Sequence, residues 1–233
     1  MPIKEDIIMK RMPVSSRYCE SNGQEYFSYQ NQGGLQRGRI NARKFLPYLG
    51  ESDRVLDFGC GGGSLLANLN CRQKVGVEIN PTARSEAVAN GIAVYENVED
   101  VPAGSVNVII SNHALEHVLN PYEALRLLFN VLAPGGKFVL ALPFDDWRTQ
   151  PREDINDINH HLYTWSPLLI GNLLHEVGLV DISAFVYSHA WPPRYWQKLD
   201  ILLPVWAFDL VCKYVAWRDN RRQVIAIGYK PKQ

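Results

Sequence analysis

The segment that most constrains the fold is 55–64, where a short apolar run passes through Asp57 into a cluster of glycines. Glycine adopts positive φ readily and leaves no Cβ between the backbone and a ligand. Apolar residues at helical spacing follow Ser64, so the segment is typical of a buried strand, a glycine loop and the start of a helix. This order predicts a nucleotide-type binding loop at the carboxyl end of a parallel strand.

Length and composition indicate one globular α/β domain with additions. The chain has 233 residues, of which 46% are hydrophobic and 21% charged. The net charge of zero argues against broad binding to nucleic acid, which needs a basic face. The four cysteines have no CxxC spacing, so neither a zinc site nor a disulfide framework is expected, and a reducing cytosol is the default. Neither a secretory signal in residues 1–11 nor a membrane-spanning segment is expected.

Apolar periodicity and turn residues divide the chain into alternating strands and helices. We expect strands at 54–58, 74–78, 92–95, 106–111, 137–142, 181–188 and 223–229, and helices at 35–49, 64–69, 82–90, 121–132 and 166–177. Such alternation predicts a parallel sheet with helical crossovers. The last two strands are expected to pair as an antiparallel hairpin with a helical insertion, 189–222, between them. Residues 1–33 are expected to form an N-terminal extension or cap, and residues 34–233 the main domain.

Two acidic residues near the glycine loop restrict the class of ligand that can bind there. A dinucleotide fingerprint needs a third glycine at the sixth position from Gly59, and that position is Ser64. A carboxylate at Asp57 would repel a pyrophosphate and suits a ligand with ammonium and sulfonium groups. Glu78, at the end of the second strand, can accept hydrogen bonds from both hydroxyls of a ribose. In the alternative interpretation the loop serves helix packing only, and Asp57 caps the neighbouring helix.

These residues resemble the class I S-adenosylmethionine-dependent methyltransferases over about residues 40–190. The similar segments follow the family's order: the glycine loop 55–64, the second-strand acid in 75–78, the fourth-strand segment 105–118 and the turn 132–137. The resemblance implies a doubly wound, mainly parallel, Rossmann-like sheet of seven strands in the order 3-2-1-4-5-7-6. It also implies S-adenosyl-L-methionine as cofactor and S-adenosyl-L-homocysteine as product.

The resemblance places the cofactor contacts at the ends of the first four strands. Asp57 would orient the methionine part, Glu78 would hold the ribose hydroxyls, and Ile79 would pack on the adenine. Either the side chain of Asn97 or the backbone of Val98 would contact the adenine amino group. The full set of expected cofactor-binding residues is Asp57, Phe58, Gly59, Gly61, Glu78, Ile79, Asn97, Val98, Ser111 and Asn112.

Three histidines are candidate catalytic residues, because an oxygen or nitrogen nucleophile can need a general base. They are His113, which lies closest to the expected methyl position, His117, and His161 in a segment after the fifth strand. In an alternative interpretation His117 and Glu116 only stabilise the loop and the helix start. The segment after the fifth strand also contains potential metal ligands, namely Asp154, Asp157 and His160. Their spacing matches no metal-binding motif, so no metal is expected.

The segment after the fourth strand limits the acceptor. It reads Ser111-Asn112-His113-Ala114, and not the Asp/Asn-Pro-Pro-aromatic stretch of enzymes that methylate nucleobase or protein amide nitrogens. We therefore expect a small-molecule, glycan or lipid-linked acceptor, methylated on oxygen, and no nucleic acid. The alternatives are a protein that binds the cofactor without catalysis and an NAD-type oxidoreductase.

The insertion 189–222 is rich in aromatic residues, and basic residues follow its apolar part. One interpretation is a helix that packs on the domain or forms a homodimer. The other is an interfacial helix or substrate lid, since tryptophan and tyrosine suit a membrane boundary. The protein is thus expected to be cytoplasmic and, in the second interpretation, peripheral to the membrane through 191–217. The expected apolar stripe comprises Leu199, Leu202, Leu203, Trp206 and Leu210.

Overall fold

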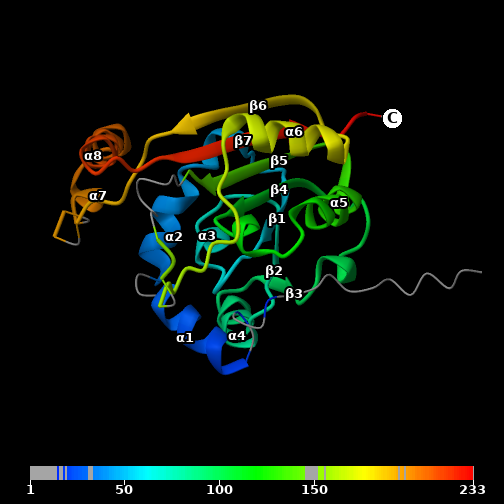
Figure 1. Cartoon of the computed structure of the whole chain (residues 1–233), viewed down its shortest axis with the longest axis horizontal. Helices are drawn as coiled ribbons and strands as arrows, with labels where there is room; N and C mark the ends of the chain where they lie inside the picture. Colours follow the sequence, from blue (N-terminus) through cyan, green and yellow to red (C-terminus); the bar gives the residue numbers. More distant parts are fainter. Residues whose placement is uncertain are drawn as a thin grey trace, which may run out of the picture.

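A mixed sheet of seven strands lies at the centre of the structure (Figure 1). The computed structural model describes residues 15, 18, 20–30, 34–144, 152–154, 156–193, 195–196 and 198–232. The strand order is β3-β2-β1-β4-β5-β7-β6, in which β7 runs antiparallel to both neighbours and the other pairs are parallel. The predicted order and C-terminal hairpin are confirmed. The strands are β1 (Arg54–Phe58), β2 (Gln73–Val77), β3 (Ala93–Tyr95), β4 (Val106–Asn112), β5 (Leu132–Pro143), β6 (Val180–Tyr187) and β7 (Gln223–Tyr229).

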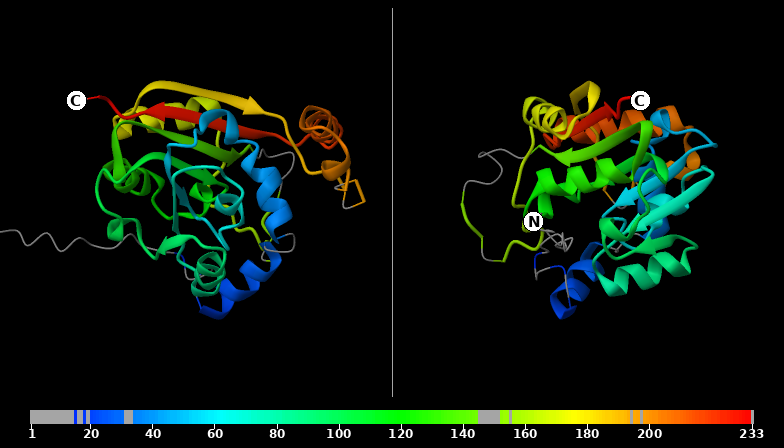
Figure 2. Two further views of the ribbon diagram at one scale, coloured as in Figure 1. Left: turned by 180° about the vertical axis from the view of Figure 1, so that it is seen from behind. Right: turned by 90° about the vertical axis from the view of Figure 1, so that its right-hand side faces the viewer.

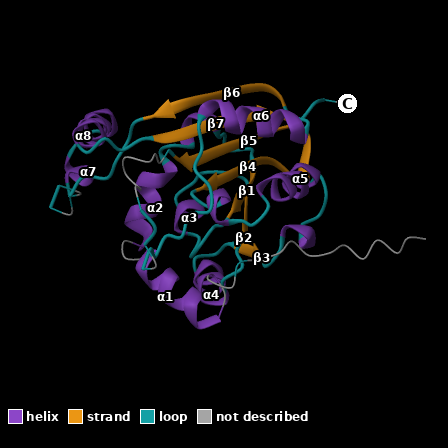
Figure 3. Cartoon of the chain, in the orientation of Figure 1, coloured by secondary structure: helices purple, strands orange, loops and turns teal. Residues whose placement is uncertain are grey.

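Helices cover both faces of the sheet, as expected for a doubly wound fold (Figures 2 and 3). Side chains alternate along each strand, so Leu56 points to one face and Val55 to the other. The first face is covered by α5 (Pro121–Val131) and α6 (Pro167–Val177). The second face is covered by α2 (Gly34–Ala42), α3 (Ser64–Ala67) and α4 (Pro81–Ala89), while α1 (Glu20–Gln30) lies against α4.

Three helices begin with a side-chain cap followed by proline. The side chains of Asn80, Asn120 and Ser166 each accept a hydrogen bond from a backbone N–H in the first turn of α4, α5 and α6. Proline suits the next position because its missing N–H has no partner there. These caps fix where α4, α5 and α6 begin.

One strand begins earlier than expected. The chain was expected to turn at Pro134–Gly136 and enter the fifth strand at 137, but β5 starts at Leu132 and contains this turn. Gly135 has φ of +74°, and its N–H donates to the carbonyl of Lys230 at 3.0 Å. The N–H of Lys230 donates in return to Gly136 at 2.8 Å. The segment after β7 therefore pairs with residues that look like a turn in the sequence.

One expected helix is shorter. The segment 35–49 is α-helical only to Ala42, after which the N–H groups of residues 43–45 bond to carbonyls three residues back. A 3-10 helix follows over Leu46–Tyr48. Pro47 has no N–H and so cannot continue an α-helix. Helix α3 also ends two residues early, at Ala67, and the remaining boundaries agree with expectation to within one residue.

The insertion forms two helices, α7 (Leu199–Leu202) and α8 (Val205–Arg218), separated at Pro204. Both lie beside α2 at one end of the sheet (Figures 1 and 2). The expected single stripe is wrong: Leu199 and Leu203 pack inward, whereas the outer residues of α7 and α8 are exposed. No helix in the described ranges is long and apolar enough to cross a membrane. The expectation for residues 1–11 falls outside these ranges, and the division at residues 33 and 34 stays a prediction.

Candidate functional site

A cavity of about 260 Å³ opens at the carboxyl ends of β1, β2 and β4. The parallel strands end at one edge of the sheet, so loops distant in sequence meet there. The loop after β1 forms one wall, residues 96–99 after β3 form another, and residues 112–118 form the side next to β4. Tyr18, Tyr26 and Phe27 from the N-terminal segment, with Asn41 of α2, complete the lining.

Gly59 lets the loop after β1 approach the loop after β4. It has φ of +74°, and a Cβ at this position would lie 2.4 Å from the Cβ of Ala114. The N–H groups of Gly59 and Cys60 both donate to the carbonyl of Val77, at 2.9 and 3.2 Å. The loop is thus held across the end of β2, with its backbone exposed to the cavity.

Two buried acids line the cavity. Asp57 is 2% exposed, and its Oδ1 has no hydrogen-bond partner among the described residues. Burial, reinforced by the nearby charge of Glu78, raises the pKa of Asp57 well above its usual range. Burial also raises the pKa of Glu78. Two backbone hydrogen bonds oppose this shift: the N–H of Gly61 donates to Oε2 at 2.8 Å, and the N–H of Asn80 donates to Oε1 at 2.9 Å. A cationic ligand would lower the cost of keeping both acids ionised.

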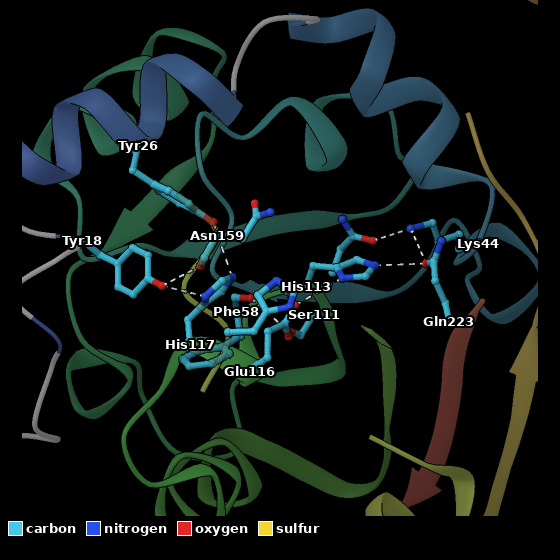
Figure 4. A network of polar contacts seen from close by, with 12 residues as sticks. Tyr18, Tyr26, Lys44, Phe58, Ser111, His113, Glu116, His117, Asn159 and Gln223 are labelled. Atoms are coloured by element: carbon cyan, nitrogen blue, oxygen red, sulfur yellow. Dashed lines mark hydrogen bonds and ion pairs between the residues drawn. The ribbon is translucent and has the colours of Figure 1, made fainter. Parts of the chain in front are cut away.

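His117 is held by two tyrosines of the N-terminal segment (Figure 4). The hydroxyl of Tyr18 lies 2.7 Å from Nδ1, and that of Tyr26 lies 3.4 Å from Nε2. The Tyr18 hydroxyl is also 3.1 Å from the carbonyl of Asn159. Burial lowers the pKa of His117 to about 4, although the charge of Glu116 opposes the shift. His117 is therefore neutral at pH 7.

His113 lies between a carboxylate and an amide oxygen. Its Nδ1 is 3.2 Å from Oε1 of Glu116, and its Nε2 is 3.1 Å from Oε1 of Gln223. Both ring nitrogens therefore lie beside polar side chains, which fix the orientation of the ring. Burial would raise the pKa of Glu116, but the neighbouring imidazoles of His113 and His117 hold it below its usual value. His113 also has φ of +56°, an uncommon conformation for a non-glycine residue.

Lys44, in the turn after α2, extends this network to the sheet (Figure 4). Its Nζ donates to Oδ1 of Asn112 at 2.8 Å and to Oε1 of Gln223 at 2.9 Å. Burial lowers the pKa of Lys44 to about 7, although the negative charge of Glu116 acts to raise it. Gln223 donates in turn to the carbonyl of His189 at 3.1 Å. The position of the His113 ring is therefore set by Glu116 in the loop after β4 and by Gln223 of β7, which Lys44 holds in turn.

Most of the expected site residues line the cavity: Asp57, Phe58, Gly59, Gly61, Glu78, Ile79, Asn97, Val98, Asn112, His113 and His117. Ser111 and His161 do not. Ser111 is 1% exposed and its Oγ donates to the carbonyl of Phe58 at 3.1 Å, so it joins β4 to β1. The ring of His161 lies 5.0 Å from that of His117, on the side of Glu116. The side chain of Asn97 donates to Asp100 at 3.1 Å, and its contact with adenine stays a prediction.

Within the described ranges, one group of side chains brings potential metal ligands within 4.8 Å of one another: Glu116, His117 and His161. Asp154 and Asp157, the acids considered as metal ligands from the sequence, instead accept backbone hydrogen bonds. Asp154 accepts from the N–H of Asn156, and Asp157 accepts from the N–H groups of Asn159 and His160. These two acids therefore stabilise the loop backbone. The absence of a metal from the site stays a prediction.

Lys44 and Gln223 belong to the network at the site but were not among the expected site residues. Lys44 looks like an ordinary helical lysine, and Gln223 is only the first residue of a strand. No local signal marks either residue, because their contact depends on the pairing of β7 with β5. Tyr18 and Tyr26 were noticeable only as aromatic residues in a polar segment.

Comparison with known proteins identifies the family. Residues 28–184 match the model of the family described as methyltransferase domain. The chain belongs to this family. Among curated relatives, the methyltransferase is 36% identical over 101 residues to a ubiquinone biosynthesis O-methyltransferase of Xanthomonas euvesicatoria, covering 38% of the chain and 42% of the relative. A protein of the same name from Xanthomonas campestris is 34% identical over 115 residues, covering 44% and 46%. The match thus spans less than half of each relative.

Solved structures show the same fold for the methyltransferase. A SAM-dependent methyltransferase of Thermotoga maritima, described as a possible histamine N-methyltransferase, aligns with a TM-score of 0.63 and 17% identity, over 87% of this chain and 94% of the other. Phosphoethanolamine N-methyltransferase 2 of Haemonchus contortus, solved with S-adenosyl-L-methionine, aligns with a TM-score of 0.59 and 14% identity, over 94% and 58%. The fold expected from the glycine loop and the later motifs is confirmed.

Proposed function

We propose that the methyltransferase moves a methyl group from S-adenosyl-L-methionine to a hydroxyl of a small-molecule, glycan or lipid-linked acceptor. The observation that carries the proposal is the pair of buried acids in the cavity. Asp57 has an oxygen without a hydrogen-bond partner among the described residues, and Glu78 lies beside it at the end of the next strand. An uncompensated buried acid is costly unless a ligand satisfies it.

The residues present fit this cofactor. Both oxygens of Glu78 accept backbone N–H groups, and each oxygen keeps a further lone pair for a ribose hydroxyl. Oδ1 of Asp57 would accept from the ammonium group of the methionine part. Gly59 lets the loop after β1 pack against Ala114, and this packing keeps the loop backbone at the cavity wall. Ile79 and Val98 supply apolar surface for the adenine.

The bound cofactor would supply an electrophilic methyl on a sulfonium, so the protein mainly aligns the acceptor and excludes water. His117 is the candidate to accept the hydroxyl proton, because it is neutral at pH 7 and lines the cavity. Its pKa of about 4 makes it a weak base, so it would pass the proton on to solvent. The ring of His113, held between Glu116 and Gln223, is suited to form a fixed wall against which the acceptor packs. A neutral imidazole at the cavity supports an oxygen acceptor, as does the similarity to the O-methyltransferases of Xanthomonas.

Calorimetry with S-adenosyl-L-methionine, S-adenosyl-L-homocysteine and NADH tests the cofactor assignment. We expect the first two to bind, and binding of NADH alone would contradict the proposal. Turnover is then measured with methyl-labelled cofactor and a panel of phenols, sugars, lipid-linked hydroxyls and amines. Product on oxygen supports the proposal. Product on amine nitrogen alone would overturn the oxygen assignment, and tight cofactor binding without product from any acceptor would favour a non-catalytic binding protein.

A further inference from the structure

The outer face of α7 and α8 carries large apolar side chains that are exposed. Their exposed fractions run from 51% at Tyr214 to 77% at Trp217. In α8 they recur at helical spacing on one side of the helix. We call this the aromatic face, and it comprises Ile201, Leu202, Trp206, Leu210, Tyr214 and Trp217.

The opposite side of the same helices anchors them to the domain. Phe208 and Cys212 are fully buried against Ile40 of α2, with Leu199 and Leu203 packed around them. Asp200 is buried and bound by Arg39 and Arg43, and Arg43 also binds Asp209 at 3.2 Å. The packing of α8 therefore does not depend on covering the aromatic face, which is presented on a fixed support.

The insertion that carries the aromatic face also carries exposed basic side chains. Lys198, Lys213, Arg218, Arg221 and Arg222 are exposed. The acids of the insertion are Asp200, Asp209 and Asp219, and each is bound to an arginine. The whole chain has no net charge, so this region concentrates positive charge that is balanced elsewhere on the molecule.

We infer that the aromatic face docks on an anionic phospholipid surface. Tryptophan and tyrosine favour the headgroup boundary, and leucine and isoleucine enter the acyl region. The exposed lysines and arginines of the insertion are attracted to anionic headgroups. With four and 14 residues, α7 and α8 lie on a membrane and do not span it. A second copy docked through the same face would bring the basic residues of two insertions together, and repulsion between like charges opposes this arrangement.

The docking surface adjoins the cavity through α2. This helix packs on α8 through Ile40, contributes Asn41 to the cavity lining, and leads into Lys44, which contacts Asn112. A membrane at the aromatic face would therefore lie close to the side of the cavity formed by α2. Docking itself does not depend on the proposed reaction, and vesicle binding can be measured without any acceptor.

Sedimentation of the full chain with phospholipid vesicles tests the inference. We expect binding to phosphatidylserine-containing vesicles that weakens as salt rises, and little binding to phosphatidylcholine alone. The double variant Trp206→Ser/Trp217→Ser should lower the partition coefficient at least ~tenfold, because each large apolar side chain contributes substantially when buried. The matched control is Leu168→Ser/Val88→Ser, which removes two exposed apolar residues from other helices and should bind like the native chain.

A charge-reversal variant keeps the test decisive if the tryptophan variant fails to fold. Arg221→Glu/Arg222→Glu lies outside the helices and should remove the preference for anionic vesicles. Retained calorimetric binding of S-adenosyl-L-methionine or a native circular-dichroism spectrum shows that a variant is folded. Absence of binding to anionic vesicles at low salt would overturn the inference. So would a dimer in light scattering that the tryptophan variant converts to monomer, since the face would then join two copies.

Discussion

The hydroxyl of Tyr18 lies 2.7 Å from Nδ1 of His117 and joins the N-terminal segment to the loop after β4. The ring of Tyr18 also stacks edge-on against Tyr26, with centroids 5.0 Å apart. Both tyrosines line the cavity. The N-terminal segment therefore covers the cavity on the side of the proposed base, where exclusion of water strengthens polar interactions.

Removal of the Tyr18 hydroxyl should weaken the fold measurably. Tyr18→Phe leaves Nδ1 of His117 and the carbonyl of Asn159 without this partner. We expect the free energy of unfolding to fall by about 1–3 kcal/mol in urea titrations. The control is Tyr26→Phe, whose contact with His117 is 3.4 Å and should contribute less. Equal losses in the two variants would contradict the importance of the Tyr18 contact.

A methyl group at Gly59 should damage the cofactor site. Gly59→Ala combines positive φ with a contact of 2.4 Å to Ala114. We expect a loss of about 1–3 kcal/mol in stability and a weakened affinity for S-adenosyl-L-methionine. Gly104→Ala is the matched control, because Gly104 has φ of +63° with no atom within 4 Å of the added Cβ. If the control loses as much affinity as Gly59→Ala, steric approach at the loop is not the cause.

Neutralisation of the two acids should separate their roles. Asp57→Asn and Glu78→Gln each keep the shape of the side chain and remove a charge-assisted acceptor. Calorimetry should show a loss of about 1–3 kcal/mol in cofactor binding for each variant. Glu78→Gln should also lower stability, because Glu78 accepts from Gly61 and Asn80 within the protein. Unchanged affinity in both variants would mean that the cofactor binds elsewhere.

Stability should depend on two buried histidines between pH 7 and pH 4. Burial lowers the pKa of both His117 and His189 to about 4. The unfolded chain then binds more protons than the native one in this range, so these groups destabilise the fold as the pH falls from about 6.5 towards 4, by up to about 3 kcal/mol each. The raised pKa values of Asp57 and Glu78 act in the opposite direction.

Comparison of variants isolates the histidine contribution. Urea unfolding of native protein, His117→Gln and His189→Gln is followed at several pH values. Each variant should show a smaller loss of stability on acidification than the native protein, because one proton-binding group of the unfolded chain is gone. Parallel pH profiles for all three proteins would show that neither histidine is linked to folding.

Local sequence predicted the elements that build the cofactor side of the site. Strand β1, its glycine loop and the acids Asp57 and Glu78 are adjacent in sequence to the features that identify them, and the structure places all of them at the cavity. Expectations failed where a distant segment intervened. The turn before β5 became strand because Lys230 pairs with Gly135 and Gly136, and the apolar stripe of the insertion divided because α2 covers one of its sides.

The sequence by itself determined the fold family and the identity of the cofactor loop, since strand, glycine turn and helix are encoded over neighbouring residues. Only the tertiary structure decided which polar groups meet at the end of β4. Ser111 faces the carbonyl of Phe58, while Asn112 meets Lys44 and His113 meets Gln223. These contacts join β1, the segment after α2, the end of β4 and β7, and they depend on strand order and register, which local sequence does not specify.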